Sequence, residues 1–247
     1  MNRWKGRVAV VTGASAGIGN ATCKALLREG LIVVGFARRK AKMEESMADV
    51  PEATDNFFPY ECDVTNLESV TEAFQWIEQK FGLLHVLINN AGMVRLNTVV
   101  DVDIKDIHDV VSLNLMGVVY CCREGIKLMR KNDHEAHVIN INSIYGHRVH
   151  LVQGLYFNIY SATKHAITGL TETLQKELLG GKVKVTSLSP GCVRTDLFNE
   201  TDFDQSLYQH FPALSPTDIA DAIVFAISRP AHVQITELTI RPLGEAI

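Results

Sequence analysis

Short apolar runs alternate along the chain with longer segments in which apolar residues recur at helical spacing. The short runs have the length of β-strands, and the longer segments have the period of amphipathic helices. The pattern predicts strands at residues 7–12, 31–37, 57–62, 86–89, 136–141, 182–189 and 237–240. It predicts helices near residues 18–29, 67–81, 104–131, 160–179 and 216–228.

The alternation of strand and helix predicts the fold class. βαβ units with right-handed crossovers build a parallel sheet and cover both of its faces with helices. We therefore expect an α/β protein with a doubly wound, Rossmann-like parallel sheet of about seven strands. No Pro/Ser-rich linker, low-complexity tract or internal repeat divides the sequence, so we expect residues 1–247 to form a single domain.

Composition and charge narrow the classes of partner. The formal net charge of -4 gives no reason to expect nucleic acid or an anionic membrane surface. No apolar run reaches the roughly 18 residues of a membrane span. Residues 1–7 lead directly into a strand without the apolar core of a secretory signal, and we expect a cytoplasmic protein.

The five cysteines predict neither a disulfide framework nor a metal site. They are odd in number, scattered and without CxxC spacing or a nearby His pair. We expect reduced, mostly buried thiols, with a redox-active Cys192 as the alternative.

A glycine-rich turn follows the first predicted strand and opens the first predicted helix. It reads Thr12-Gly13-Ala14-Ser15-Ala16-Gly17-Ile18-Gly19. Glycines let backbone approach a pyrophosphate, and a helix N-terminus attracts negative charge. The turn predicts a dinucleotide site, although its spacing departs from GxGxxG and a flexible glycine turn is the alternative.

The end of the second predicted strand indicates which dinucleotide binds. An NAD site places an acid there for the ribose 2′-hydroxyl, whereas this chain has Arg38 and Arg39. Guanidinium groups can donate charge-assisted hydrogen bonds to a 2′-phosphate, so the sequence favours NADP(H). The alternative is a solvated basic helix start.

Two further strand ends contribute candidate cofactor contacts. Asp63, followed by Val64, can accept a hydrogen bond from an adenine amino group or can simply initiate a helix. Asn90, Ala91 and Gly92 end the fourth strand, where small residues suit a turn pressed against a cofactor or an ordinary turn.

The strongest candidate for chemistry is the pair Tyr160 and Lys164, which stand four residues apart. That spacing places both side chains on one face of a helix. A phenol has an ordinary pKa of about 10, and an ammonium beside it favours the phenolate and lowers that pKa. The pair can therefore move protons; the alternative is a surface Tyr and Lys at coincidental spacing.

Together these residues resemble the short-chain dehydrogenase/reductase family over essentially the whole chain. The resemblance rests on an ordered set: the Gly13/Gly17/Gly19 turn, Asn89-Asn90-Ala91-Gly92, Asn114, Ser143, the Tyr160/Lys164 pair, and Pro190-Gly191 followed by Thr195. It implies an NADP(H)-dependent oxidoreductase.

The resemblance also implies the roles of four residues. Tyr160 would be the general acid/base, and Ser143 would hydrogen-bond the substrate oxygen. Lys164 would hold the nicotinamide ribose and lower the tyrosine pKa, and Asn114 would carry a water in the proton relay. In reduction, charge develops on the carbonyl oxygen, where Ser143 and Tyr160 stabilise it before Tyr160 supplies the proton.

The resemblance further assigns the segment after the sixth strand. Thr195 and the backbone of Val193 would bond the nicotinamide carboxamide, just beyond Pro190 and Gly191. A substrate lid is expected over residues 193–215, where apolar residues suit an apolar substrate, although a lid packed only on protein would have the same composition. These apolar residues are Leu197, Phe198, Phe203, Leu207, Tyr208 and Phe211.

Three side chains near the pair are expected to have structural rather than catalytic roles. Neither Tyr145 nor Tyr156 has a lysine four residues on, and we expect both in the pocket wall or core. His147 is expected to be structural, with a substrate contact as the alternative.

The chain resembles one branch of the family in particular, which contains insect NADP-dependent farnesol dehydrogenases and vertebrate reductases of keto- and hydroxysteroids. The similarity lies in residues 146–149, 160–178 and 229–242. This similarity implies a lipophilic alcohol or ketone substrate and a homodimer or homotetramer. The segment between His147 and Tyr160 is about two residues longer than in that branch. A small polar or diketone substrate, or a catalytically idle dinucleotide-binding sensor, are the alternatives.

Overall fold

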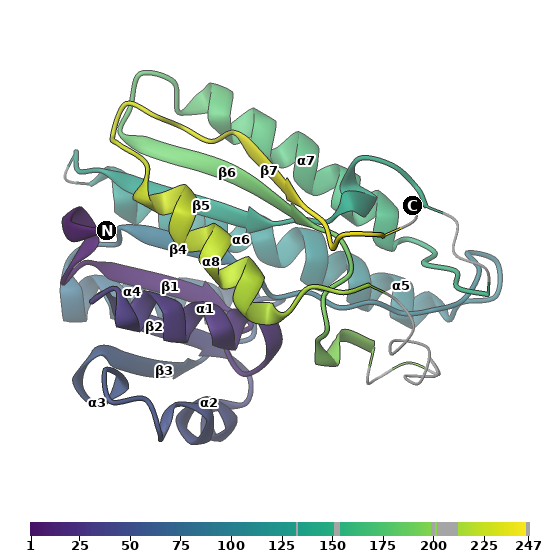
Figure 1. Cartoon of the computed structure of the whole chain (residues 1–247), viewed down its shortest axis with the longest axis horizontal. Coiled ribbons are helices and arrows are strands. Elements are labelled where there is room, and N and C mark those ends of the chain that lie inside the picture. The colour runs from purple at the N-terminus through teal and green to yellow at the C-terminus, as the bar shows by residue number, and fades with distance from the viewer. Residues whose placement is uncertain (132, 151–153, 199–200, 202–211, 246–247) are drawn as a thin grey trace.

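One parallel sheet of seven strands forms the centre of this computed structural model, which describes residues 1–131, 133–150, 154–198, 201 and 212–245 (Figure 1). In sheet order the strands are β3 (Phe57–Glu61), β2 (Ile32–Ala37), β1 (Val8–Thr12), β4 (Val86–Asn89), β5 (Ala136–Ile141), β6 (Val183–Pro190) and β7 (Glu237–Ile240). The chain order reverses between β1 and β4. Doubly wound sheets bind ligands outside the carboxyl ends of the strands at such a point.

One face of the sheet is covered by α1 (Gly17–Arg28) and α8 (Pro216–Ser228), which pack against each other, with α2 (Lys40–Met47) and α3 (Ala53–Asn56) joining the same core. Leu26, Ile223 and Val11 are fully buried there. The neighbouring Val10 points to the other face and is also fully buried. Burial on both faces explains why the strands are nearly continuous apolar runs.

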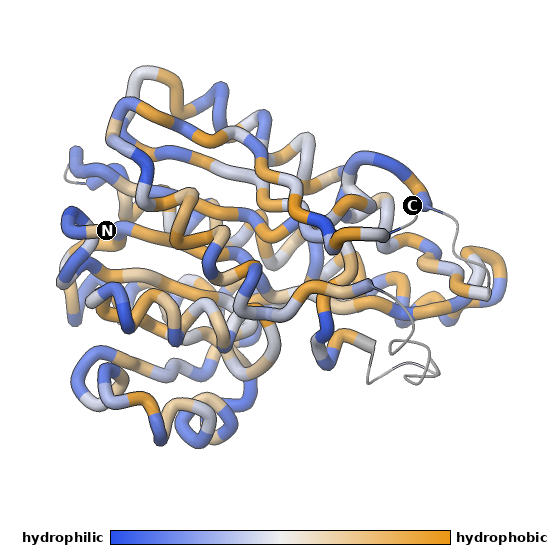
Figure 2. Tube along the Cα trace, in the orientation of Figure 1, coloured by the Kyte–Doolittle hydropathy of each residue, from blue (hydrophilic) through white to orange (hydrophobic). Residues whose placement is uncertain are grey.

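The opposite face is covered by α4 (Leu67–Phe81), α6 (Gly117–Arg130) and α7 (Tyr160–Glu177). α5 (Ile104–Val111) leads into α6 through a turn of π-helix, η2 (Ser112–Met116). Phe36 and Phe74 pack edge to face in this core, with ring centroids 5.6 Å apart. Figure 2 shows the helices as alternating hydrophobic and hydrophilic segments, as expected for helices with one buried side.

Local sequence sets where two of these helices begin. Asn66 caps α4, because its side-chain oxygen accepts the Glu68 backbone N–H at 2.8 Å. Ser215 and Asp218 form a reciprocal capping box at α8, and Pro216 occupies its first turn, where a missing N–H has no cost. Both caps satisfy N–H groups that a helix start leaves without partners.

The predicted fold class is confirmed, and most element bounds agree to within two residues. The helices α2 and α3 were not predicted. In α2 only Met43 and Met47 are buried, so its sequence has too few apolar residues to show a helical period. The predicted helix over 104–131 contains the π-helical turn, which the hydrophobic pattern does not reveal.

Three further observations bear on the chain's class. Within the described residues, no helix combines the length and apolarity that crossing a membrane requires. All five cysteines are free thiols, and four of them are buried, with Cys192 partly exposed. The described His, Cys, Asp and Glu side chains form no cluster of three that could hold a metal ion.

Candidate active site

A cleft of about 1480 Å³ opens at the carboxyl ends of the strands. Its walls come from the turns that follow β1 through β6. Pockets for one small ligand have volumes of roughly 300–1,000 Å³. The cleft is therefore large enough for a dinucleotide together with a second molecule.

The glycine turn after β1 forms one end of the cleft. Gly13 and Gly17 have φ angles of 66° and 52°, which L side chains rarely adopt. Gly19 has no room for a side chain, because a Cβ would lie 2.3 Å from the Gly13 carbonyl oxygen. Gly13, Ser15, Gly17 and Ile18 line the cleft, with the N–H groups at the start of α1 beside it. The turn is a cradle of backbone suited to a pyrophosphate.

The turn after β4 is fastened to the turn after β1. Thr12 Oγ1 accepts the backbone N–H groups of Asn90 and Ala91 at 2.9 and 3.0 Å. The Asn90 side-chain amide donates to the Thr12 carbonyl at 2.9 Å. Asn90, Ala91 and Gly92 all line the cleft, as predicted. Thr12 was not singled out from the sequence, since a threonine at a strand end is unremarkable by itself.

The ends of β2 and β3 form the next part of the wall. Arg38 and Arg39 are exposed and line the cleft, and Arg39 Nη2 lies 3.5 Å from Ser15 Oγ. Asp63 and Val64 line it as well. The Asp63 carboxylate accepts hydrogen bonds from the Thr65 N–H and hydroxyl at 3.0 and 2.7 Å. Asn66 caps α4, so Asp63 is not the helix-initiating residue.

Tyr160 and Lys164 lie in the first turns of α7 and both line the cleft. They are only 8% and 7% exposed, which excludes a coincidental surface pair. The Lys164 ammonium donates to the Ile141 carbonyl at 3.0 Å and lies 5.7 Å from the centroid of the Tyr160 ring. Ser143, at the end of β5, is hydrogen-bonded to Tyr160. Three polar groups thus meet at the floor of the cleft.

Burial dominates the titration of this pair. It raises the pKa of Tyr160 to about 12, against a smaller lowering by the Ser143 hydrogen bond. It lowers the pKa of Lys164 to about 8. Both shifts have burial as their largest cause, because the charged form of each group loses its hydration. The phenol is therefore a proton donor at neutral pH.

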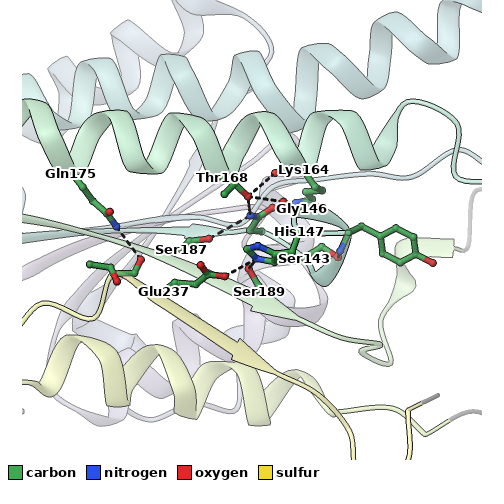
Figure 3. A network of polar contacts seen from close by, with 12 residues as sticks. Ser143, Gly146, His147, Lys164, Thr168, Gln175, Ser187, Ser189 and Glu237 are labelled. Carbon is green, nitrogen blue, oxygen red and sulfur yellow. Dashed lines mark hydrogen bonds and ion pairs between the residues drawn. The ribbon is translucent and has the colours of Figure 1, made fainter. Parts of the chain in front are cut away.

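The turn that carries Ser143 is η3 (Ile144–Gly146), and a polar network holds it against α7 (Figure 3). Thr168 Oγ1 donates to the Gly146 carbonyl at 2.9 Å and accepts from the Asn142 side chain at 2.9 Å. A Cβ on Gly146 would lie 2.6 Å from the Asn142 amide. The network fixes the distance between the Ser143 turn and the helix of Tyr160 and Lys164.

The aromatic and histidine residues nearby divide into two groups. Tyr145 is 9% exposed and forms part of the cleft wall, as expected, whereas Tyr156 is 57% exposed, so the expectation for it is wrong. His147 Nε2 contacts Ser189 Oγ at 2.9 Å and Glu237 at 2.7 Å (Figure 3). These contacts tie His147 to β6 and β7, which supports its structural interpretation.

Asn114 lies in the π-helical turn η2, a distortion often found at functional sites. Its side chain is 1% exposed and is bonded to the backbone of Met93, accepting the N–H and donating to the carbonyl, both at 2.8 Å. The cleft-lining residues of this element are Ser112 and Leu113. Asn114 therefore fixes the loop after β4 behind the wall of the cleft.

The segment after β6 closes the other side of the cleft. Pro190, Gly191, Val193 and Thr195 all line it. A Cβ on Gly17 would lie 3.2 Å from Thr195, so this segment reaches the glycine turn. Of the predicted lid, Leu197 lines the cleft. Phe203, Leu207, Tyr208 and Phe211 lie outside the described residues.

Comparisons with known proteins agree with this geometry. The family model for short chain dehydrogenase matches residues 7–206. The chain is 41% identical to farnesol dehydrogenase of Aedes aegypti over 249 residues, with 99% of each chain covered. It is 38% identical to dehydrogenase/reductase SDR family member 11 of Mus musculus over 252 residues, which cover 98% of this chain and 96% of that protein.

A solved structure has the same architecture. The closed form of serine dehydrogenase complexed with NADP⁺ superposes with a TM-score of 0.89 at 27% identity, over 97% of this chain and 96% of that chain.

The packing of Gly19 gives a first prediction. Gly19→Ala places a methyl group 2.3 Å from the Gly13 carbonyl oxygen, so the turn must shift. We expect the affinity for a nicotinamide dinucleotide, measured by fluorescence titration, to fall by at least about tenfold. The matched control is Gly169→Ala in α7, where a Cβ meets nothing within 4 Å. An equal loss of affinity in both variants would contradict the packing argument.

The buried Lys164 gives a prediction on pH and stability. Its pKa is about 8 in the folded chain against an ordinary 10.5, so between these values the unfolded chain binds the extra proton. Stability contributed by Lys164 therefore rises with pH through this window, and the penalty for the buried charge is fully present below pH 8. Relative to Lys164→Met, the wild type should gain on the order of 2 kcal/mol between pH 8 and 10 in urea unfolding. Parallel pH dependences would refute this.

Proposed function

This chain belongs to the short-chain dehydrogenase family, and we propose that it transfers hydride between NADP(H) and a lipophilic alcohol or carbonyl compound. Membership makes it an oxidoreductase that uses a nicotinamide dinucleotide. The observation that carries the finer proposal is the meeting of buried Ser143, Tyr160 and Lys164 in a cleft whose other end is a glycine cradle.

The bound dinucleotide would supply the hydride chemistry, and the chain's residues would bind and orient it. The cradle of Gly13, Ser15, Gly17, Ile18 and Gly19 fits a pyrophosphate, since side chains are excluded where backbone must approach. Lys164, which lines the cleft, would hold the nicotinamide ribose. The remaining cofactor contacts would come from Asp63, Val64, Asn90, Ala91, Gly92, Pro190, Gly191, Val193 and Thr195, all of which line the cleft.

Tyr160 and Ser143 would act on the substrate oxygen. In reduction, Ser143 donates a hydrogen bond to the oxygen as charge develops, and Tyr160 delivers its proton. The raised pKa of Tyr160 keeps the phenol protonated at neutral pH, which suits reduction. In oxidation, the same phenolic oxygen receives the alcohol proton. Asn114 supports this chemistry from behind, by fixing the loop at Met93 and, as we propose, by carrying a water of the proton relay.

Two observations support NADP(H) rather than NAD(H). Arg38 and Arg39 line the cleft just after β2, at the position where an NAD site has an acid. Both side chains are exposed, and their guanidinium groups can donate paired hydrogen bonds to a 2′-phosphate.

Support for a lipophilic substrate comes from the substrate end of the cleft. Its walls include Val94, Leu155, Phe157 and Leu197, whose side chains are apolar. The relative at 41% identity is a farnesol dehydrogenase. We further propose that residues 193–215 cover the bound substrate as a lid and that the protein forms a homodimer or homotetramer.

Replacement of Tyr160 tests the proposed reaction. Tyr160→Phe removes only the hydroxyl, so NADPH-dependent reduction of ketones should fall by about 10²–10⁴-fold while NADPH affinity stays within about threefold. Tyr145→Phe is the matched control, because Tyr145 lines the same cleft but lacks a lysine four residues on. Absorbance at the NADPH band follows turnover. Retained activity in Tyr160→Phe would remove Tyr160 from the acid/base role.

Charge reversal at Arg38 tests the cofactor choice. A carboxylate there would repel the 2′-phosphate and accept from a 2′-hydroxyl, so Arg38→Asp should lower the NADPH-over-NADH ratio of kcat/KM by about tenfold or more. Arg28→Asp makes the same change of charge at the exposed end of α1, away from the cleft, and should leave the ratio unchanged. Equal ratios in wild type and Arg38→Asp would disprove the argument for the 2′-phosphate.

A further inference from the structure

The C-terminal segment returns to the substrate end of the cleft (Figure 1). The Gly191 N–H donates to the Ile240 carbonyl at 2.7 Å and joins the ends of β6 and β7. Residues 242–245 then form a turn in which the Glu245 N–H donates to the Pro242 carbonyl at 3.2 Å. Gly244, with φ of 85°, allows this turn. Gly244 and Glu245 become part of the cleft wall.

The Glu245 carboxylate is built into this wall. Its Oε1 accepts the Cys192 N–H at 2.7 Å, and its Oε2 accepts from Arg241 Nε at 2.8 Å. The side chain is 8% exposed. Gly191 provides the space, because a Cβ there would lie 2.3 Å from Oε2. The carboxylate is therefore held in a fixed position by two N–H donors.

The negative end of this ion pair faces the cleft. Glu245 lines the cleft, whereas Arg241 is not among the described residues that do so, and the Arg241 side chain is 36% exposed to solvent. The field of Glu245 reaches its neighbours: it adds to burial in raising the pKa of Cys192 to about 11 and, after burial and Tyr160, it raises that of Tyr145. Both neighbours lie in the wall of the substrate end.

Two cations that line the cleft, Arg95 and Lys105, have carboxylate partners, whereas Lys164 at its floor donates to the Ile141 carbonyl. Arg95 lies 3.2 Å from Asp106, and Lys105 lies 2.9 Å from Asp109. Arg38 and Arg39 belong to the dinucleotide end. At the wall formed by Tyr145 and Cys192, the charges that act on Cys192 are the Glu245 carboxylate and, more weakly, the Arg194 cation.

We propose that Glu245 determines specificity by charge, making the substrate end selective for uncharged molecules and against those with a carboxylate or phosphate. The inference deepens the proposed function and rests on it. An anion close to a poorly solvated carboxylate is repelled, because screening by water is weak there. A neutral hydroxyl can instead donate to the lone pairs that Cys192 and Arg241 leave free.

A matched pair of ketones tests the proposal. 4-Acetylbenzoate and its methyl ester share the reacting acetyl group and differ by one charge. Their dissociation constants are measured by calorimetry on the complex of the protein with NADP⁺, which has no hydride to transfer. We expect the wild type to bind the ester at least about tenfold more tightly. Glu245→Gln retains an acceptor for the Cys192 N–H and removes the charge, so the ratio should fall well below that of the wild type.

The control is Glu237→Gln, which removes a carboxylate from β7 that contacts His147 and should preserve the wild-type ratio. Equal affinities in the wild type, or a ratio that Glu245→Gln leaves unchanged, would overturn the proposal. If Glu245→Gln does not fold, Arg241→Gln is measured in its place; it removes the cation that partly compensates Glu245, so the ratio should rise. Turnover of the ester with NADPH is assayed separately, so failure of the reaction is distinguishable from failure of charge selection.

Discussion

The turns after β1 and β4 pack so closely that Gly13 and Gly19 have no space for side chains, and Thr12 and Asn90 bond them together. This contact stands where the strand order reverses, so the start of α1 faces open space at the edge of the sheet. A dinucleotide bound as we propose would have its pyrophosphate at this contact. The position of its nicotinamide end would then follow from this one anchor.

At the other end of the cleft, Tyr160 and Lys164 are buried against the sheet, and α7 sets the spacing between them. Removing Lys164 and Tyr160 from water disfavours their charged forms, as the direction of both pKa shifts shows. The Ile141 carbonyl compensates the ammonium in part. Thr168 and Asn142 keep the Ser143 turn against the same helix, so the three polar groups cannot drift apart. Buried, hydrogen-bonded supports of this kind hold neighbouring side chains in fixed positions.

Features with a strong local signal could be predicted from the sequence: long apolar periods, a glycine turn and a Tyr/Lys spacing. The polar helix α2 and the π-helical turn at Asn114 could not, since neither alters the hydrophobic period. The titration of Tyr160 depends on burial, which only the assembled fold determines. Glu245 follows the last predicted element, and its role arises from contact with Cys192, 53 residues away in sequence.

The two ends of the cleft are built on strands that differ in how deeply they are buried. The dinucleotide end stands on β1, which is buried along its whole length, whereas β7 is a four-residue edge strand with alternate residues exposed. Edge strands with few buried contacts open at lower free energy than central ones. The segment from Gly191 to Thr195 is tied to β7 through the Gly191–Ile240 hydrogen bond and through Glu245. Local opening at that edge would therefore loosen the segment after β6 while leaving the glycine turn after β1 intact.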